Sequence, residues 1–391
     1  MEGPSSSELA NTGIQMKILL NGLAAVYPLS GVAQYTIQLG RSLEALLGPE
    51  NIFWFGKNSS NHNFELYNND PSFINRFQHN IKKGLRQVPG SNVLIYIWRN
   101  NRFGSYARTV KPSLYHETKY TPFNFEDGPT LVTIYDLSFV RHPEWHPLDR
   151  VKFYEKYSLK QLSRVEAIIT ISEFSKKEIS DLLNIDRSKI HVTYPGVDPI
   201  FAPGKKRIHG LPNRYILHLG NLEPRKNLPL LLDAYQSLPG SFQDKYPLVI
   251  AGAKGWCTDE IEKKLRLLRK NGKVTLMGYV PQRSLPDLYR GASLFVYPSF
   301  YEGFGLPPLE AMACGVPVIV SNTTSLPEVV GDAGIYVDPN DTEQISVSID
   351  LVLSDPQLHR ALSEKGIERA KLFSWEKTAR ETLTLYKKLV T

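Results

Sequence analysis

The chain has 391 residues, a length that suits two domains better than one small core. Hydrophobic residues make up 42% and no apolar run approaches the ~18 residues of a membrane span, so we expect an ordinary soluble globular protein. Two cysteines without metal-ligand spacing and a modest net charge of +7 exclude a disulfide framework and give no indication of nucleic-acid binding.

Residues 1–15 are Ser-rich and polar and lack the charged-then-apolar plan of a secretory signal. We expect them to form a disordered extension outside the fold. The first domain then opens with an apolar strand at 16–20, a loop from Gly22 to Gly31 and an apolar-periodic helix over 33–47.

The rest of the first domain alternates strand and helix patterns. Short apolar runs predict strands at 52–55, 93–96, 113–115, 131–135, 167–171 and 190–193. A helical pattern covers 149–163, and Ser175-Lys-Lys-Glu178 has the spacing of a capping box that starts another helix. This alternation predicts a mostly parallel, doubly wound α/β sheet.

A Gly-, Pro- and Lys-containing segment at 195–212 predicts an interdomain linker. Strands are then expected at 215–219, 247–251, 274–277, 294–297, 316–320 and 334–337, and a last helix at 375–389. We therefore predict a first domain at 16–200, a second at 201–374 and a terminal segment at 375–391. Two such Rossmann-like parallel-sheet domains would face each other across a cleft that suits a pair of substrates.

The segment 71–115 carries eight basic residues and no acidic one, with aromatic residues interleaved. Such a patch would attract an anionic membrane surface or a lipid-diphosphate acceptor. A solvated basic face over ordinary core aromatics explains the same pattern equally well.

The most informative stretch surrounds Glu302 and Glu310, which lie eight positions apart. The preceding apolar run predicts a parallel strand, and Gly303 and Gly305 then open a helix, so the loop lies where open α/β sheets bind ligands. Free N–H groups at a helix start suit a phosphate, and the carboxylates suit sugar hydroxyls. A plain strand-to-helix turn, with a Glu that complements the helix dipole, is the alternative.

This stretch resembles the E-x7-E signature of retaining glycosyltransferase family 4, which has the GT-B fold. Three further motifs of that family follow its order and spacing within 16–391: Tyr194-Pro-Gly-Val-Asp198, Leu219-Gly-Asn-Leu-Glu-Pro-Arg-Lys-Asn227 and Met277-Gly-Tyr-Val-Pro281. The resemblance is to GDP-mannose-dependent mannosyltransferases of bacterial polysaccharide assembly. It also implies that the last helix crosses back onto the first domain.

The resemblance implies a donor-binding set. Lys226 and Arg225 would clamp the diphosphate, Glu302 would contact the transferred sugar, and Glu310 would accept from the ribose hydroxyls. The remaining donor-binding residues are Gly31 beside the diphosphate, the backbone of Gly303, Phe304, Gly305 and Leu306, and Gly278, Tyr279 and Val280 around the base. Cations at a helix start oppose its dipole, so Arg225 and Lys226 need a reason of this kind to be there.

The expected catalytic residues are Glu302, Lys226 and His116, the last lying beside the anomeric carbon by resemblance. Many relatives have His-Asp after the next strand, where this chain has Tyr135-Asp136, so it departs from the family at the position where a general base would lie. Asp136 would orient the acceptor hydroxyl or cap the turn. No Asp-x-Asp occurs, so we expect no metal or other cofactor, and a front-face mechanism in which the leaving phosphate takes the acceptor proton.

We therefore expect a retaining hexosyltransferase that moves mannose from GDP-mannose onto a lipid-linked oligosaccharide in O-antigen or exopolysaccharide synthesis. A UDP-hexose or GDP-rhamnose donor is the alternative within the same chemistry. A non-catalytic sugar-nucleotide-binding subunit and a nucleotide-dependent oxidoreductase are alternatives of other classes, the latter without a Gly-x-Gly-x-x-Gly motif. The expected location is the cytoplasm, peripheral to the inner membrane.

Overall fold

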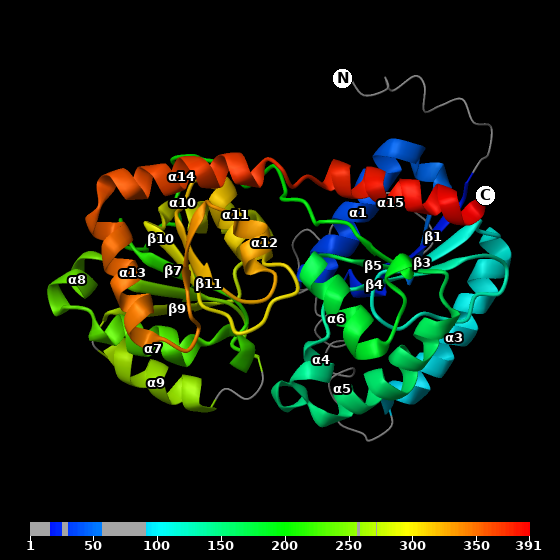
Figure 1. The fold of residues 1–391 in the computed structure, drawn as a ribbon, viewed down its shortest axis with the longest axis horizontal. Helices are drawn as coiled ribbons and strands as arrows, with labels where there is room; N and C mark the ends of the chain where they lie inside the picture. Colours follow the sequence, from blue (N-terminus) through cyan, green and yellow to red (C-terminus); the bar gives the residue numbers. More distant parts are fainter. Residues whose placement is uncertain (1–15, 26–29, 57–90, 256–258, 271) are drawn as a thin grey trace. The chain divides into compact units, whose positions relative to one another are not determined.

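The computed structural model describes residues 16–25, 30–56, 91–255, 259–270 and 272–391 (Figure 1). Residues 1–15 and the basic residues between 76 and 86 lie outside this range, so the expectations for them are not addressed by the structure. The described chain divides into two compact units. The first holds the chain up to Thr133, Tyr157–Ile168 and Ala379–Thr391, and the second holds Ile134–Lys156 and Ile169–Thr378.

The first sheet has six strands in the order β2-β1-β3-β4-β5-β6. Its strands are β1 (Ile18–Asn21), β2 (Ile52–Phe55), β3 (Leu114–Glu117), β4 (Thr130–Ile134), β5 (Ala167–Thr170) and β6 (Ile190–Val192). β1 pairs in parallel with β2 and β3, and β3 pairs in parallel with β4. The expected parallel sheet is therefore confirmed, and its central strands are fully buried, as their uninterrupted apolar sequences require.

The strand expected at 93–96 is wrong, because these residues belong to the helix α3 (Ser91–Val110). Tyr96 contacts the core that is built around Phe103 and Ala107, whereas Leu94 and Trp98 remain exposed. This is the 3.6-residue period of a helix, which a four-residue apolar run is too short to reveal.

Three other helices of this half begin within two residues of the expected positions: α1 (Gly31–Leu47), α5 (Leu148–Phe153) and α6 (Glu173–Leu183). The short helix α4 (Ser138–Arg141) was not expected from the sequence. The expected helix over 149–163 changes type after α5, to a π-helix at Tyr154–Ser158 and a 3-10 helix at Leu159–Arg164. The capping residue of α6 is Ser172 and not Ser175, because the Ser172 hydroxyl accepts from the Ser175 N–H (3.0 Å) while the Ser175 hydroxyl binds backbone carbonyls.

The second sheet also has six parallel strands, in the order β12-β11-β10-β7-β8-β9. Its strands are β7 (Ile216–Leu219), β8 (Leu248–Ala251), β9 (Val274–Gly278), β10 (Leu294–Tyr297), β11 (Val318–Ser321) and β12 (Gly334–Val337). Its helices are α7 (Leu228–Ser237), α8 (Gly240–Lys245), α9 (Asp259–Lys270), α10 (Leu285–Gly291), α11 (Leu306–Ala313), α12 (Leu326–Val330), α13 (Thr342–Ser354) and α14 (Pro356–Ala370). The strands lie where the sequence predicts them, to within two residues at each end.

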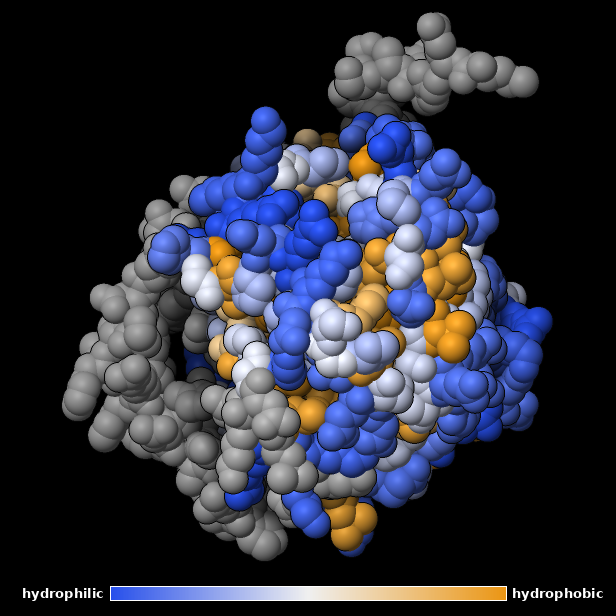
Figure 2. All heavy atoms as spheres, turned by 90° about the vertical axis from the view of Figure 1, so that its left-hand side faces the viewer, coloured by the Kyte–Doolittle hydropathy of each residue, from blue (hydrophilic) through white to orange (hydrophobic). Residues whose placement is uncertain are grey.

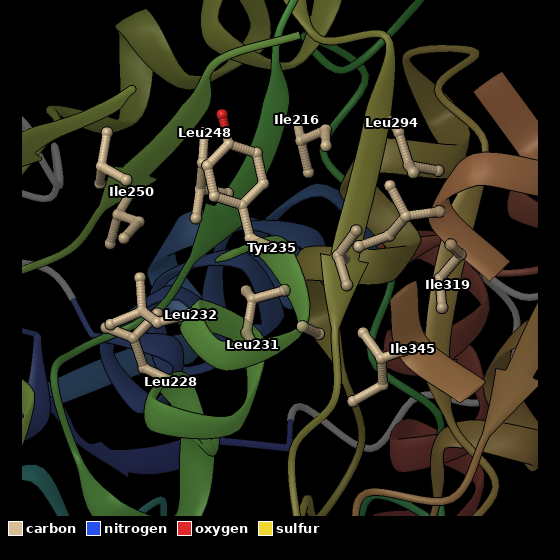
Figure 3. Close-up of a cluster of buried hydrophobic side chains, with 14 of the residues drawn as sticks. Ile216, Leu228, Leu231, Leu232, Tyr235, Leu248, Ile250, Leu294, Ile319 and Ile345 are labelled. Carbon is tan, nitrogen blue, oxygen red and sulfur yellow. The ribbon is translucent and has the colours of Figure 1, made fainter. Parts of the chain in front are cut away.

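The core of the second unit lies between the sheet and helices α7, α9 and α13. Leu228, Leu231, Leu232 and Tyr235 of α7 belong to the same buried cluster as Ile216 and Leu248 of the sheet, and Figure 3 shows the Tyr235 ring beside Leu248. The leucines of α7 recur at the spacing of one helical face, so the helix buries that face against the strands. The face formed by α8 and α13 is shown in Figure 2. It is mostly hydrophilic, with smaller apolar areas between the polar ones.

Short 3-10 helices connect several of these elements. They are η1 (Gly22–Ala24), η2 (Pro49–Asn51), η3 (Pro143–Trp145), η6 (Arg187–Lys189), η7 (Pro224–Lys226) and η8 (Gln282–Ser284). The last helix, α15 (Trp375–Val390), starts in the second unit, and its residues from Ala379 onward belong to the first unit.

Candidate functional site

The candidate site lies at the carboxyl ends of β7 and β10, which are neighbours in the second sheet. After β7 the chain continues into β8, which lies on one side of β7 in the sheet, whereas β10 lies on the other side of β7. The strand order therefore reverses between β7 and β10. Such a switch point leaves the two loops diverging, and open α/β sheets bind their ligands there. The loop after β7 carries Arg225 and Lys226, and the loop after β10 carries Glu302.

Lys226 and Glu302 form a buried ion pair at this switch point. The Lys226 Nζ lies 2.6 Å from Glu302 Oε1, and each residue is 6% exposed. Nζ also donates to the Tyr297 hydroxyl and lies 4.9 Å from the centre of its ring. The Lys226 ammonium group therefore lies between the Glu302 carboxylate and the Tyr297 ring, and both of these partners come from β10 and the loop after it.

Arg225 extends the pair into a chain of four charges. Its Nη1 donates to Glu302 Oε2 at 2.9 Å, and its Nε donates to Glu223 Oε2 at 3.0 Å. Arg225 also donates to the Tyr301 carbonyl (3.2 Å), which fixes the plane of the guanidinium. Two cations and two carboxylates balance each other, which is how a buried charged cluster avoids a large desolvation cost.

The cluster keeps its charges because each one compensates another. Burial would raise the pKa of Glu302, but Lys226 and Arg225 lower that pKa to about 2. Burial and the neighbouring Arg225 lower the pKa of Lys226, whereas Glu302 and Glu223 raise it. Glu302 is therefore a carboxylate at neutral pH.

The loop after Glu302 offers backbone donors. Among the described residues, no acceptor pairs with the N–H groups of Gly303, Phe304, Gly305 or Leu306, which lead into α11. Gly305 has a φ of 111°, a conformation that side chains oppose, and so glycine is required for this turn. The loop and the α11 N-terminus together suit an anion, although Pro307 and Pro308 remove two further donors.

Glu310 lies on α11, apart from the charged cluster of Arg225, Lys226 and Glu302. Its Oε2 accepts from the Tyr289 hydroxyl at 2.8 Å, and burial raises its pKa to about 8. The two carboxylates of the E-x7-E pattern therefore differ in ionisation: Glu302 is charged, whereas Glu310 is mostly protonated at neutral pH.

The expected base-binding and diphosphate-binding glycines fall at element ends. Gly278 ends β9 with a φ of 70°, and Tyr279 and Val280 follow it. Gly31 is exposed at the start of α1 in the first unit, where Ser30 caps the helix. Within the described residues, no group of three or more His, Cys, Asp or Glu is arranged to hold a metal ion.

His116 lies in β3 of the first unit and is completely buried. Its Nδ1 is 2.5 Å from the Tyr386 hydroxyl, and its Nε2 is 2.7 Å from the Thr133 hydroxyl. Burial lowers its pKa to about 3, so the imidazole is neutral. A contact between His116 and a substrate would require one of these two hydrogen bonds to break.

Asp136 follows β4 and lies against the Glu302 loop within the second unit. Its Oδ1 accepts from both the N–H (3.0 Å) and the hydroxyl (2.8 Å) of Ser138. A Cβ added at Gly303 would lie 2.2 Å from the Tyr135 carbonyl oxygen and 3.1 Å from the Asp136 Cβ. Only glycine permits this approach, which brings Asp136 beside the residue that follows Glu302.

The sequence reasoning missed two residues of the cluster, Glu223 and Tyr297. Glu223 belongs to the Glu-Pro-Arg-Lys motif and lies two positions before Arg225. This spacing of opposite charges could have predicted the Glu223–Arg225 ion pair. Tyr297 ends β10 and has the character of an ordinary apolar strand residue. Its position over Lys226 follows only from the pairing of β10 with β7.

Two family models together match most of the chain. Residues 29–201 match the family model described as Glycosyltransferase Family 4, and residues 204–369 match the model described as Glycosyl transferases group 1. The O-antigen chain mannosyltransferase B of Escherichia coli is 37% identical over 393 residues, which cover 96% of this chain and all of that protein.

Two solved structures have the same fold at low sequence identity. The sucrose-phosphate synthase of Thermosynechococcus elongatus covers 96% of this chain and 99% of its own, with a TM-score of 0.69 and 21% identity. HepE of Anabaena, in complex with UDP and glucose, covers 96% of this chain and all of its own, with a TM-score of 0.70 and 16% identity. These matches show the expected GT-B fold.

Proposed function

The chain belongs to glycosyltransferase family 4, and we propose that it transfers mannose from GDP-mannose to a growing lipid-linked O-antigen chain. Membership of the family implies a nucleotide-sugar donor. The similarity to an O-antigen mannosyltransferase along almost the whole chain supports the sugar and the pathway. The observation that carries the chemistry is the Arg225–Lys226–Glu302 cluster at the β7/β10 switch point.

The cluster contains the groups that departure of a nucleoside diphosphate requires. Negative charge develops on the leaving phosphate, and Lys226, Arg225 and the backbone amides of the Glu302 loop would stabilise it. Both cations are paired with Glu302 in the structure. The diphosphate would share these cations, while the Glu302 carboxylate would accept from sugar hydroxyls and face the positive charge on the ring.

The remaining assignments are proposals for the same reaction. Glu310 would accept from the ribose hydroxyls, Gly278 to Val280 would hold the base, and Gly31 would approach the diphosphate. Asp136 would orient the acceptor hydroxyl on the face of the sugar from which the diphosphate leaves. The acceptor oxygen would bond to the anomeric carbon as the bond to the diphosphate breaks, and its proton would pass to the leaving phosphate. Attack on the face of departure would retain the anomeric configuration. His116 would act next to the transferred sugar only if it leaves Tyr386 or Thr133.

Donor binding tests this proposal most directly. A ligand that binds only the folded state raises the midpoint of thermal unfolding, so GDP-, UDP-, ADP- and TDP-sugars can be compared without added metal. We expect a selective shift with GDP-mannose that Lys226→Gln removes and that the exposed-site control Lys177→Gln keeps. A shift with UDP-hexoses alone would show that the donor is a UDP-hexose and not GDP-mannose. If no sugar nucleotide shifts the midpoint, the proposed donor-binding site is wrong.

Stereochemistry is tested on the product. Transfer from GDP-α-mannose to octyl α-mannoside should give an α-linkage, visible in the one-bond C–H coupling of the new anomeric carbon. A β-linked product would contradict retention, even if the donor is correct.

We also propose that α3 brings the enzyme to the cytoplasmic face of an anionic membrane. Leu94, Ile97 and Trp98 lie at i, i+3 and i+4 of α3 and are 71%, 49% and 57% exposed. Arg102 lies over the Trp98 ring, and α3 has no acidic residue. No described helix is long and apolar enough to cross a membrane. An apolar strip with basic neighbours suits a position within the head groups.

Vesicle co-sedimentation tests the membrane contact. The protein should bind phosphatidylglycerol vesicles and not phosphatidylcholine vesicles, and the double variant Leu94→Ala/Trp98→Ala should bind at least about fivefold more weakly. Leu372→Ala, which removes another exposed leucine (56%), is the control. Equal binding by the double variant and the control would exclude α3 as the contact.

A further inference from the structure

Three ring side chains of the second unit lie nearly parallel beside the Glu302 loop, and we call them the aromatic shelf: His142, Trp145 and Phe300. The His142 and Trp145 ring centres are 3.8 Å apart with 15° between the planes. Trp145 and Phe300 are 6.3 Å apart with 26° between the planes. All three are partly exposed, so the stack reaches the surface of the second unit.

The aromatic shelf is continuous with the charged cluster. The Phe300 N–H donates to the Arg225 carbonyl at 2.9 Å, and Glu302 follows Phe300 by two residues. Trp145 and His142 come from the segment after β4, whose beginning is held against Gly303 by the close approach of the Tyr135 carbonyl. The aromatic shelf therefore adjoins the end of the site where the sugar, rather than the ribose, is expected.

Polar groups on the same segment accompany the rings. The Ser138 hydroxyl donates to Asp136 Oδ1, and His146 Nε2 lies 3.1 Å from the same hydroxyl. Asp136 is only partly buried, and its Oδ1 accepts from Ser138. Aromatic walls with a few fixed polar groups are the usual lining of a small-molecule site.

We propose that the aromatic shelf, together with Asp136, is the subsite for the terminal hexose of the glycan acceptor. A pyranose has an apolar face of C–H groups that packs on an aromatic ring, whose negative face attracts those hydrogens. Its hydroxyls at the ring edge would reach the Asp136 carboxylate, which would orient the one that attacks. This assignment rests on the proposed function, because it names the acceptor of that same reaction.

A nucleotide base also stacks on aromatic rings, and the contacts favour the sugar over it. The carboxylate expected to hold the ribose, Glu310, is bonded to Tyr289 of α10. Phe300 of the aromatic shelf is instead bonded directly to Arg225 of the diphosphate clamp. The aromatic shelf is therefore joined to the diphosphate clamp, whereas the carboxylate expected at the ribose is joined to α10.

The experiment separates acceptor binding from donor binding. For Trp145→Ala we expect the KM for octyl α-mannoside to rise about tenfold, while the Kd for GDP by calorimetry stays unchanged. Trp145→Phe should recover most of the loss, since it keeps a ring. Leu148→Ala is the matched control, because Leu148 is 66% exposed and lies three residues further along the same segment.

A second measurement does not depend on turnover. Saturation-transfer NMR should detect a mannose disaccharide on the wild-type protein in the presence of GDP, and Trp145→Ala should abolish the signal. An unchanged acceptor KM, weaker GDP binding in Trp145→Ala, or no disaccharide binding by the wild type would each overturn the subsite. The proposed function fails separately, through absent GDP-mannose binding by the wild type.

Discussion

The two sheets of this protein have the same kind of switch point, yet the polar clusters there differ in charge. In the second sheet, Lys226 and Glu302 lie after β7 and β10 as a pair of full charges. In the first sheet, Glu117 ends β3 and accepts from the Asn21 side chain at the end of β1 (2.6 Å). Both carboxylates are buried, so burial alone does not decide whether such a group ionises.

The difference lies in the partners. Glu117 accepts from Tyr115, Asn21 and the Lys119 backbone N–H, all neutral donors, and burial raises its pKa to about 8. Glu302 has two cations within hydrogen-bond distance, and its pKa is about 2. The same topology thus forms a neutral cluster in one sheet and a charged cluster in the other, according to whether the adjacent loop supplies lysine and arginine.

Removing the charge of Glu302 should have the largest effect on the reaction. For Glu302→Gln we expect kcat to fall about 100-fold, because the positive charge on the ring loses its opposing carboxylate. GDP should bind more tightly than to the wild type, since Lys226 and Arg225 lose the group that competes with the diphosphate. Steady-state kinetics and calorimetry measure the two effects, and weaker GDP binding would contradict the competition.

Glu223→Gln should have a smaller effect that depends on pH. Lys226 faces Arg225, Glu302, Glu223, Tyr297 and His218. Burial lowers its pKa and Glu223 opposes that shift, so loss of this carboxylate lowers the pKa of Lys226 further.

The alkaline limb of kcat/KM should therefore move to lower pH in Glu223→Gln, with about a tenfold loss at the optimum. Asp233→Asn, which removes a partly exposed carboxylate paired with Lys264, is the control. A uniform loss of activity at every pH would indicate that Glu223 only supports the fold.

Glu310→Gln tests the second carboxylate of the E-x7-E pattern. As pH rises through about 8, Glu310 ionises and becomes a better acceptor for ribose hydroxyls, so GDP affinity should rise several-fold between pH 6.5 and 9. In Glu310→Gln this rise should disappear. Calorimetry at both pH values measures the GDP affinity. If the affinity still rises with pH in Glu310→Gln, a titrating group other than Glu310 is responsible.

Glu117→Gln should leave activity unchanged and alter only stability. The pKa of Glu117 is about 8 in the folded chain and near 4.5 when unfolded, so its contribution is full below pH 4.5 and is lost as pH rises to 8. Over that range the free energy of unfolding of the wild type should fall by on the order of 4 kcal/mol relative to the variant. If the free energy of unfolding differs between wild type and variant by the same amount at pH 5 and at pH 8, Glu117 is instead already charged in the folded chain.

Much of the second sheet was predictable, because its strands are mostly apolar and four of them, β7, β8, β9 and β10, end at or just before a glycine or a proline. The strand prediction at 93–96 was wrong because α3 buries only one of its faces, and apolar residues also occur on its exposed face. The capping serine of α6 was misplaced because Ser172 and Ser175 both fit the pattern, and only the tertiary contact of Ser175 with the Tyr135 carbonyl distinguishes them.

The sequence alone determined the order of the family's motifs and the type of group in each loop, since these are local properties of glycine spacing, charge and apolar runs. The tertiary structure decided which groups meet. Lys226 and Glu302 are 76 residues apart and become partners only because β10 pairs with β7. It also decided which buried groups carry charge, because ionisation depends on the neighbours that packing brings within a few ångströms.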